Sequence, residues 1–559
     1  MRRFLWAVIG LLYVALLFIA YHGTRNYAAG HAVDGPWIVT SFDGSRLAER
    51  TEFPSAELAR ASMADKPGLT AAAHVVREAP LPMSLPFVAP IFCSAGHDGI
   101  HARYDGKDVY LTPLELRRAH AYESQGRLGV GFDFEKVWSI LSPRFSVPVA
   151  TLRTGSTLTR VRMEEETWGL VDDPFHPGTP ISVQDAQQAR TLTEANVRLS
   201  LREGADYLAR HLNQDGRFDY QIDTATGDLR DGYNLPRHAG TTTFVAQAAR
   251  ALEDPSLRQK ALIAANWLIR EKTVNCGTYR CIGENDTPNL GSAALAVLAY
   301  SAILEGGPDA RIERELLNLM NFMRSLQRDD GEFCHQYDRK ANQRIDMQMP
   351  YFSGEATYAL ARGARITRRP EDLEAAKKGF EYATRKAWSF FGSRYLPQEE
   401  HWTCQTLSEL WDRAPDEVGL QYCLDWHTIQ RGLQVKPGEG MASATGSFGV
   451  SPLIAPRVTP AGSRSESAGA TLAALLKAHP DSKDIGWLRA QFELGIAFTM
   501  QNQVRAFDAI ATDRPDVVRG GFPMTTVDGD IRIDTVQHVG AGMIRWLDLL
   551  PKPADPPPH

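Results

Sequence analysis

One pattern recurs along the chain from Thr193 onward: long helices with many charges alternate with helices rich in small and apolar residues. The spacing of the apolar residues predicts about twelve such helices. We predict charged helices at 194–212, 255–272, 310–327, 370–388, 416–433 and 482–502, and small-residue helices at 239–252, 290–305, 353–366, 402–413, 464–478 and 535–549. A charged helix suits an outer ring with one wet face, whereas a small-residue helix suits an inner ring packed on both sides. The repeated pairs predict an (α/α)6 toroid over residues 193–550.

Two turns repeat with the helix pairs, and a third resembles them. The turns are Gln214-Asp215-Gly216-Arg217-Phe218, Arg328-Asp329-Asp330-Gly331-Glu332-Phe333 and Arg519-Gly520-Gly521-Phe522. Each follows a charged helix and precedes the loop into a small-residue helix. Glycine permits the turn, and phenylalanine can anchor the loop on the core. The turns therefore support the same repeat.

The chain before the toroid does not repeat. Residues 31–170 mix strand and turn signals and predict a small α+β domain, with a hairpin over 100–111 around an Asp-Gly turn and a helix that starts at Thr112-Pro113. The domain carries no catalytic motif that we recognise. Residues 171–192 are rich in Pro, Gly and Asp and predict a linker, and the Pro-rich tail at 551–559 is predicted to be disordered.

The N-terminus carries a targeting signal. Met1-Arg2-Arg3 precedes an uncharged apolar run from Phe4 to Ala20. The arginines should stay in the cytoplasm, and the run is at the short end for a membrane span. A cleaved signal peptide is the alternative, but the residues after the run lack a clear cleavage site. We predict an uncleaved signal-anchor transmembrane helix over residues 1–30, which would place the bulk of the chain in the periplasm of a bacterium, tethered to the inner membrane.

The net charge and the cysteines bear on three questions: nucleic-acid binding, disulfides and metal binding. The net charge of −6 argues against nucleic acid as a partner. An exported chain permits disulfides, and Cys276–Cys281 and Cys404–Cys423 are spaced for two local bridges. Zinc held by Cys334, His335, His401 and Cys404 is the alternative, but the spacing lacks a Cys-x-x-Cys pair. We therefore expect neither a metal nor another cofactor.

The starts of the small-residue helices carry unusual residues. If these helices run parallel, their N-termini open at one end of the toroid, where backbone N–H groups and the positive ends of the helix dipoles also point. The six starts are Arg237-His238-Ala239-Gly240, Asn289-Leu290-Gly291-Ser292 (after Glu284 and Asp286), Tyr351-Phe352-Ser353-Gly354-Glu355, Glu399-Glu400-His401-Trp402, Arg464-Ser465-Glu466-Ser467, and Arg532-Ile533-Asp534-Thr535-Val536-Gln537-His538. Together they predict one rim lined with carboxylates, histidines, arginines and aromatic rings.

Each rim residue has a functional and a structural interpretation. As catalytic acid/base candidates we take Glu355, Asp534 and Glu466, with His238, His401 and His538 as alternative bases; as substrate contacts we take Arg237, Arg464, Tyr351 and Trp402. The structural alternatives are helix-capping carboxylates, buried hydrogen-bonded histidines, an ion pair for Glu355, and loop anchors for the two aromatic residues. The combination is more specific than its members, because six such starts at one end are unlike six independent caps.

With these features, residues 193–550 resemble the (α/α)6-toroid carbohydrate-active enzymes, which include N-acylglucosamine 2-epimerase-like, glucuronyl C5-epimerase-like and toroid glycoside hydrolase families. The resemblance rests on architecture and loop pattern. No complete family motif is present, so no catalytic residue is carried over. The resemblance implies a central cleft in which paired carboxylates hydrolyse a glycosidic bond, or in which a histidine or tyrosine abstracts a proton beside a uronate carboxylate while arginine stabilises the charge.

The leading hypothesis is a membrane-anchored periplasmic enzyme, a hydrolase, epimerase or lyase, that acts on an envelope or exported polysaccharide. The alternative is a non-catalytic glycan- or peptide-binding module of an envelope assembly, because fold alone does not establish catalysis. A third possibility is a zinc-containing toroid of the lanthionine-cyclase type. Two rim carboxylates about 5 to 10 Å apart across a cleft would favour hydrolysis, whereas carboxylates that are all bonded to arginines or helix caps would favour the binding module.

Overall fold

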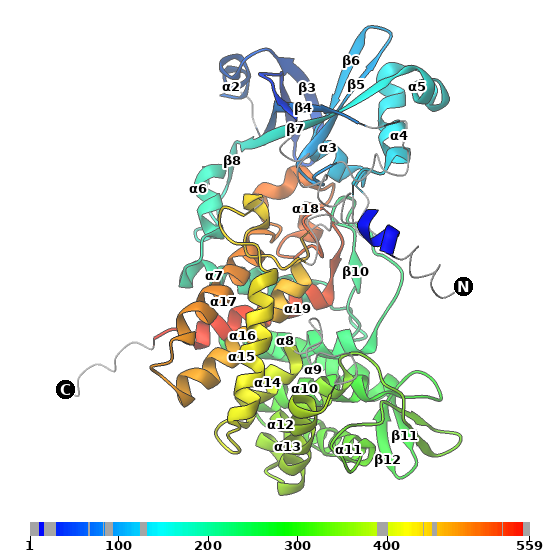
Figure 1. Cartoon of the computed structure of the whole chain (residues 1–559), viewed down its shortest axis with the longest axis vertical. Helices are drawn as coiled ribbons and strands as arrows, with labels where there is room; N and C mark the ends of the chain where they lie inside the picture. Colours follow the sequence, from blue (N-terminus) through cyan, green and yellow to red (C-terminus); the bar gives the residue numbers. More distant parts are fainter. Residues whose placement is uncertain are drawn as a thin grey trace, which may run out of the picture.

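The computed structural model describes residues 10–15, 30–64, 68–81, 83, 93–122, 131–387, 401–439, 441–449, 456–527 and 529–551. It is mainly helical, with a β-rich region near the N-terminus (Figure 1). Among the helices that lie within these residues, none is both long and apolar enough to cross a membrane. Most of the predicted anchor and the tail from residue 552 lie outside the described residues, so both stay predictions.

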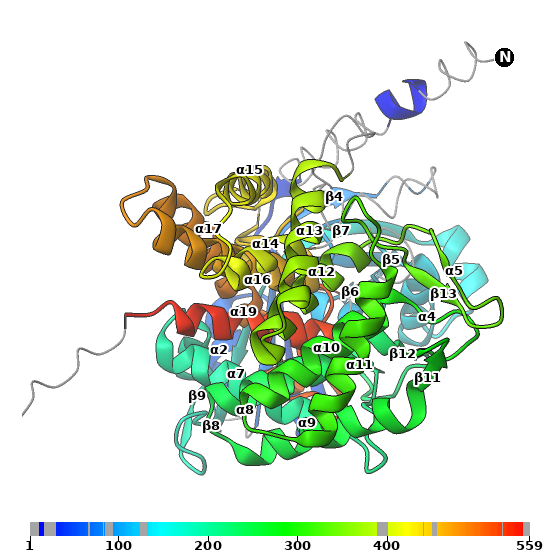
Figure 2. The same ribbon diagram turned by 90° about the horizontal axis from the view of Figure 1, so that it is seen from below.

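Twelve helices form two concentric rings, as the sequence predicts. The inner helices are α8 (Leu235–Ala251), α10 (Leu290–Glu305), α12 (Phe352–Thr367), α14 (His401–Leu410), α16 (Val458–Ala478) and α19 (Ile533–Asp548). Each packs against the next, and α19 packs against α8 and closes the ring, which can be followed in Figure 2. The outer helices are α7 (Glu194–Arg210), α9 (Pro255–Trp267), α11 (Ala310–Leu326), α13 (Pro370–Arg385), α15 (Glu417–Leu433) and α17 (Asp484–Gln501). The fold is therefore an (α/α)6 toroid.

The composition of each ring follows from its surroundings. The inner helix α10 is buried from Leu290 to Ile303, because it has a helix on each side and an outer helix behind it. The outer helix α11 buries one stripe and exposes charges on the other face. Small residues let the inner helices approach closely. Asparagine side chains cap two of the inner helices: Asn234 Oδ1 accepts the Arg237 backbone N–H, and Asn289 Oδ1 accepts that of Ser292.

Two inner helices begin earlier than the sequence pattern predicts. Helix α16 begins at Val458 rather than at residue 464, and α8 begins at Leu235 rather than at residue 239. In each helix a proline, Pro460 or Pro236, lies in the first turn, where its missing N–H would have no helical partner. Glu466 therefore lies well inside α16, so it is not a helix-capping carboxylate.

The N-terminal region is an antiparallel sheet with four helices. The strands are β1 (His31–Ala32), β2 (Trp37–Asp43), β3 (Arg46–Phe53), β4 (Thr70–Pro80), β5 (Asp98–Tyr104), β6 (Lys107–Leu111) and β7 (Thr157–Trp168), in the order β3-β2-β4-β7-β5-β6 with β1 beside β4. The helices are α2 (Ala56–Ala64), α3 (Pro113–Arg118), α4 (Phe134–Phe145) and α5 (Val149–Gly155). The predicted hairpin is β5 and β6, whose turn residues Asp105 and Gly106 both have positive φ. Thr112 and Glu115 form a capping box at the start of α3, as Thr112-Pro113 predicts.

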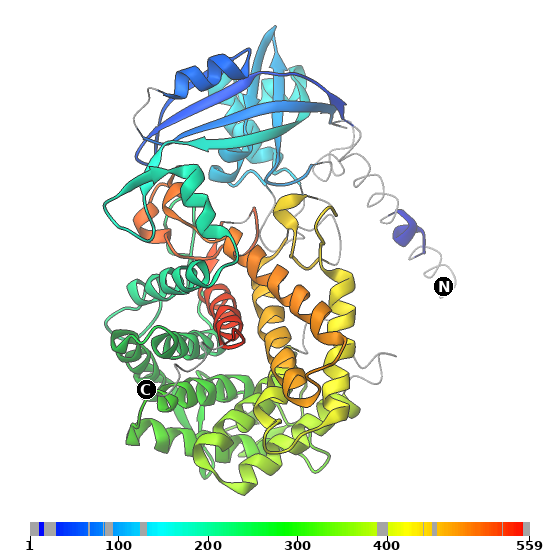
Figure 3. The same cartoon turned by 90° about the vertical axis from the view of Figure 1, so that its left-hand side faces the viewer.

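The segment predicted as a linker is folded. It forms a hairpin of β8 (Leu170–Asp172) and β9 (Pro180–Ser182), then α6 (Val183–Gln187) and the 3-10 turn η2 (Gln188–Arg190). Val183 packs with Leu114 of the β-rich region and with Phe507 and Ile510 of the toroid. Apolar residues among the prolines and glycines therefore give this connection a core of its own. Figure 3 shows the β-rich region beside the toroid. Arg118 of α3 pairs with Asp513, which lies between η6 and α18 of the toroid.

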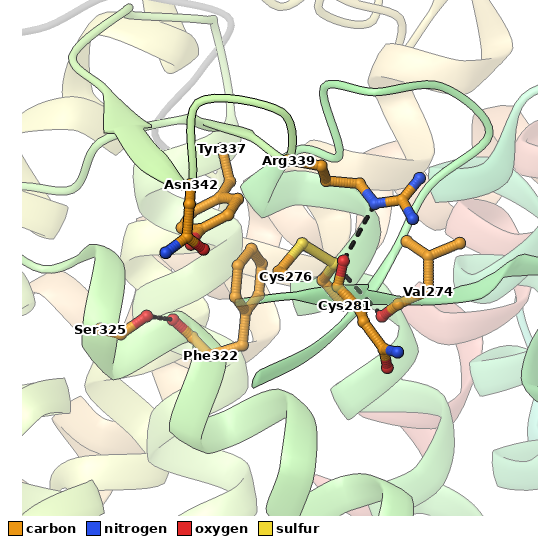
Figure 4. Close-up of a disulfide and its surroundings, with 9 residues drawn as sticks. Val274, Cys276, Cys281, Phe322, Ser325, Tyr337, Arg339 and Asn342 are labelled. Atoms are coloured by element: carbon orange, nitrogen blue, oxygen red, sulfur yellow. Dashed lines mark hydrogen bonds between the residues drawn. A yellow bond between two sulfur atoms is a disulfide. The ribbon is translucent and has the colours of Figure 1, made fainter. Parts of the chain in front are cut away.

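Two disulfides fasten the toroid at the positions that the sequence predicts. Cys276–Cys281 joins β11 (Thr273–Cys276) to β12 (Tyr279–Ile282), beside Tyr337 and Arg339 (Figure 4). Cys404–Cys423 joins α14 to α15. The remaining short elements are β10 (Gln221–Ile222), η3 (Leu268–Lys272), β13 (Gln336–Asp338), β14 (Gln343–Ile345), η5 (Ala442–Ala444), η6 (Ala506–Ala511), α18 (Pro515–Val518) and β15 (Ile531–Arg532).

Close contact within the inner ring predicts that added volume destabilises it. A Cβ at Gly540 of α19 would lie 2.2 Å from the Phe244 ring of α8. We expect Gly540→Ala to lower the free energy of unfolding by roughly 1–3 kcal/mol. Gly486→Ala in outer helix α17 is the matched control, because its Cβ would meet open space, and it should stabilise by about 0.5–1 kcal/mol. Denaturant unfolding measures both, and equal effects would contradict the packing described.

Candidate functional site

A pocket of about 530 Å³ lies at the N-terminal end of the inner ring, and all six inner helices or their caps contribute to it. The sequence-predicted residues that line it are Arg237, Tyr351, Glu355, His401, Trp402, Arg464, Asp534 and His538. Glu466 and His238 do not line it. The parallel arrangement of the inner helices therefore brings most of the predicted rim residues together.

His238 is a structural histidine that lies outside the pocket. It has no exposed surface, and its ring packs 4.7 Å from the Trp267 ring of α9. Its Nδ1 lies 2.6 Å from the Tyr233 hydroxyl, and its Nε2 lies 3.1 Å from the Ala264 carbonyl oxygen. Burial lowers its pKa to about 4. Both ring nitrogens are therefore occupied in the packing of α8 on α9, out of reach of a ligand in the pocket.

His538 and Glu466 form a buried acid–base pair. His538 Nδ1 lies 2.7 Å from Glu466 Oε1, and the other carboxylate oxygen accepts a hydrogen bond of 2.8 Å from Gln405 Nε2. Burial alone would lower the pKa of His538, but the charge of Glu466 and its hydrogen bond outweigh burial and raise it above 6.5. Glu466 thus orients His538, which lines the pocket, and raises its pKa.

Glu466 lies behind the pocket floor, against a second cavity. That cavity has a volume of about 160 Å³ and is lined by Glu466, Gln405 and residues further along the inner helices. Trp402, Leu295 and Gln537 border both cavities and so form the layer between them.

His401 lies beside His538 at the pocket floor. The two ring centres are 5.7 Å apart in an edge-on arrangement, and the Trp402 ring is 4.7 Å from His401 and 5.9 Å from His538. The Tyr351 ring contacts His401 from the rim side at 6.0 Å. Two imidazoles and two aromatic rings therefore cluster on one side of the pocket.

The Asp534 carboxylate is held by two arginines. Arg532 bonds both carboxylate oxygens, at 2.6 and 2.9 Å, and Arg237 Nε lies 3.0 Å from Oδ2. Burial would raise the pKa of Asp534, but the charges of Arg532 and Arg237 and the Arg532 hydrogen bonds lower it below 3.8. Tyr220 accepts a hydrogen bond of 2.5 Å from Arg237. Asp534 therefore stays ionised, which suits a positioning role and not that of a proton donor.

Glu355 lies in the first turn of α12 and is buried against α10. A Cβ at Gly291 would come within 2.7 Å of Glu355 Oε2, so only glycine leaves room for this carboxylate. Just before the helix, Tyr351 has a φ of 74° at the N-cap. A tyrosine in this region carries backbone strain, and such strain clusters at functional sites. The acid/base role of Glu355 stays a prediction.

The zinc alternative conflicts with the bonding of its ligands. Cys404 is joined to Cys423. His335 Nδ1 accepts the Met349 backbone N–H at 2.7 Å, and its Nε2 lies 2.8 Å from Ser353 Oγ. Within the part of the chain that the structure describes, no group of His, Cys, Asp and Glu side chains has the arrangement of a metal site. The predicted set of four ligands is therefore not available.

Two further residues had no place among the candidates: Arg457, which lines the pocket, and Gln405, which lines the second cavity. Gln405 follows His401 by four residues, and Arg457 precedes Arg464 by seven. Both spacings place side chains on one face of a helix, which is the signal that could have found them. Gln405 holds Glu466, and Arg457 adds a cation to the rim.

Comparison with known proteins supports the fold. No protein-family model matches the chain, and no curated protein matches its sequence. Among solved structures, the cellobiose 2-epimerase of Bacillus thermoamylovorans B4167 has a TM-score of 0.50 and 10% identity, over 64% of this chain and 99% of that one. A D-mannose isomerase has a TM-score of 0.49 and 14% identity, over 64% of this chain and 98% of that one.

An α-1,6-mannanase from Salegentibacter sp. HEL1_6 has a TM-score of 0.44 and 13% identity, over 63% of this chain and 98% of that one. The similar structures are (α/α)6-toroid carbohydrate-active enzymes, so the resemblance predicted from the sequence is confirmed. At this identity the likeness establishes the fold and not the reaction.

The electrostatic coupling between Glu466 and His538 can be tested directly. In Glu466→Gln the anion beside His538 is lost, so the pKa of His538 should fall below its wild-type value. Titration of the histidine C–H signals by NMR measures this, with His538→Gln to assign the resonance. An unchanged pKa would contradict the coupling.

The same pair predicts a pH dependence of stability. A histidine whose folded-state pKa is raised stabilises the fold fully below its unfolded value of about 6.5 and loses that contribution as pH rises through the folded pKa. The stability difference between wild type and Glu466→Gln should therefore shrink in that pH window.

Proposed function

We propose that the protein is a saccharide-converting enzyme that moves protons at a sugar carbon next to a carbonyl or carboxylate, as an epimerase, isomerase or lyase does. The observation that carries the proposal is the buried Glu466–His538 pair beside His401 at the floor of the pocket. The toroid fold supports it, because the similar solved structures include a cellobiose 2-epimerase and a D-mannose isomerase. That likeness alone would not carry the proposal.

His538 is the base. Its Nδ1 is bonded to Glu466, which leaves Nε2 to exchange a proton with a ligand. In the neutral form, Nε2 takes the proton of the C–H bond, and the electron pair passes to the adjacent carbonyl oxygen. Glu466 stabilises the imidazolium that forms, as a carboxylate behind a catalytic histidine does. Return of the proton to the neighbouring carbon, while the hydroxyl on the first carbon gives its proton to His401 and becomes the new carbonyl, isomerises the sugar. Return to the first carbon, after the planar intermediate has turned its other face toward Nε2, epimerises it.

His401 acts on a neighbouring atom. The ring centres of His401 and His538 are too close, at 5.7 Å, for a sugar ring to lie between them. We assign His401 to the oxygen that gains negative charge, to which it donates a proton. Trp402 and Tyr351 supply aromatic surface for the apolar face of the sugar.

Hydrolysis is less well supported. A glycoside hydrolase needs a carboxylic acid of raised pKa that protonates the leaving group. Asp534 has a lowered pKa and is bonded to two arginines, and Glu466 is bonded to His538. Bonded carboxylates would also suit a glycan-binding module, which is the second candidate function. Conversion of a bound saccharide would distinguish an enzyme from a glycan-binding module.

We also propose that the protein is exported, anchored in a bacterial inner membrane, and active on an envelope or exported polysaccharide. The apolar run after Arg2-Arg3 supports the anchor. The two disulfides support export, because such bonds persist in oxidising compartments. Neutral and acidic glycans are the expected partners; the net charge of −6 gives no support to nucleic acid.

Hydrogen exchange into a sugar tests the catalytic proposal. The full chain is incubated in D2O with a panel of neutral and acidic saccharides, and mass spectrometry and NMR detect new isomers or unsaturated products and deuterium at carbon. We expect exchange with at least one saccharide, and a decrease of about 10²- to 10⁴-fold in His538→Asn. The rate should rise with pH through the raised pKa of His538, because the neutral form is the base.

His479→Asn is the matched control. His479 also pairs with a glutamate, Glu417 at 3.0 Å, but it is exposed and does not line the pocket. It should leave exchange unchanged. Glu355→Gln and Asp534→Asn extend the test to the carboxylates, and full activity in both would remove them from the chemistry. Saccharide binding without exchange or turnover would favour the binding module.

Localisation has its own test. Fractionation of bacterial cells should recover the full-length chain with the inner membrane, and a variant that starts at residue 30 should be released from it. An intact chain in the soluble cytoplasm would overturn the anchor.

A further inference from the structure

Arg464 is a buried cation without a hydrogen-bond or ion-pair partner among the described side chains. Four arginines are buried in the part of the chain that the structure describes: Arg160, Arg362, Arg464 and Arg505. Arg362 is paired with Glu305 at 2.7 Å, Arg505 with Glu203 at 2.5 Å and Arg160 with Asp98 at 3.9 Å. Arg464 is 6% exposed. Among the described side chains, none lies within ion-pair or hydrogen-bond distance of its guanidinium group.

An unpaired buried guanidinium group is costly. The effective penalty for burying an ion is several kcal/mol, and it is offset only by an opposite charge with good hydrogen bonds. Burial, the largest effect, lowers the pKa of Arg464 to about 10. The one attractive contact of its guanidinium group that the structure shows is the Phe448 ring at 5.0 Å, and such a contact contributes about 0.5–2 kcal/mol. Within the residues that the structure describes, the fold therefore holds a cation whose charge is not matched.

The position of Arg464 explains what would match that charge. It lies on α16 and lines the pocket beside the exposed Arg457. The pocket's other two arginines, Arg237 and Arg532, are bonded to Asp534 on the α8–α19 side. Among the described pocket residues, positive charge without a paired carboxylate is thus confined to the α16 side.

We propose that Arg464, assisted by Arg457, binds the carboxylate of an acidic sugar, so that the ligand of this pocket is a uronate or a uronate-containing saccharide. A guanidinium group presents paired N–H donors that match a carboxylate. Of these two arginines only Arg464 is buried, and its single positive charge matches the single negative charge of a carboxylate better than the double charge of a phosphate ester. That the bound uronate is also the substrate rests on the proposed function; the binding itself does not.

Equilibrium binding tests the proposal without turnover. Calorimetry of the full chain compares D-glucuronate, D-glucose and inorganic phosphate. We expect glucuronate to bind about tenfold to a hundredfold more tightly than glucose, as a charge-assisted hydrogen-bonded pair provides. Arg464→Met should abolish the preference, and Arg464→Lys should retain part of it. Binding with this dependence but without exchange into the sugar would sink the proposed function and leave the site intact.

Thermal unfolding provides the matched comparison. Because Arg464 has no anionic partner among the described residues, Arg464→Met leaves no buried carboxylate there unpaired and should keep or raise the unfolding midpoint. Arg362→Met removes the partner of a buried glutamate and should lower it markedly. A large loss of stability in Arg464→Met would show that Arg464 is a structural residue.

Three binding results would overturn the proposal. They are equal affinity of wild type for glucuronate and glucose, a glucuronate preference that persists in Arg464→Met, and phosphate binding that is tighter than glucuronate binding and depends on Arg464. The last would reassign the site to phosphate groups.

Discussion

The inner ring depends on close packing of helices that are rich in small and apolar residues. Each inner helix touches two inner neighbours and an outer helix, so small and apolar side chains make up most of its contacts. Polar and charged residues lie at the helix starts and around the second cavity. Because all six start at one end of the toroid, their caps and first turns supply most of the polar residues that surround the pocket. The location of the site is a consequence of packing, and the side chains at those starts decide its chemistry.

Within the pocket, pairing divides residues of the same type into different roles. Two arginines pair with Asp534 and lower its pKa, so it stays ionised. Glu466 pairs with His538 instead and raises the pKa of that histidine. His238 and His538 are both buried, yet burial lowers the pKa of one to about 4 and a carboxylate raises that of the other. Arg464 differs from Arg237 for the same reason, because Arg237 is paired with Asp534 whereas no carboxylate among the described residues pairs with Arg464. The role of each of these side chains therefore depends on which charged group lies next to it.

Local pattern predicts the toroid, because the apolar period, the turns and the helix starts are properties of short stretches. Contacts between residues that are far apart in the sequence could not be predicted in this way. Nothing in the sequence pairs Glu466 with His538, which are 72 residues apart, or shows that Arg464 lacks a partner. Arg237 and His238 are neighbours, but adjacent residues on a helix point about 100° apart, so one faces the pocket and the other faces α9. The early start of α16 also places Glu466 away from a capping position.

The central claim is that the starts of the inner helices form one site for an acidic saccharide, with binding on α16 and proton transfer on α19. A crystal structure of the full chain with bound glucuronate tests it most directly. The account predicts the sugar in the pocket, its carboxylate within hydrogen-bond distance of Arg464 and a ring carbon within reach of His538. A sugar bound outside the pocket, or with its carboxylate against Arg237 and Arg532, would contradict it.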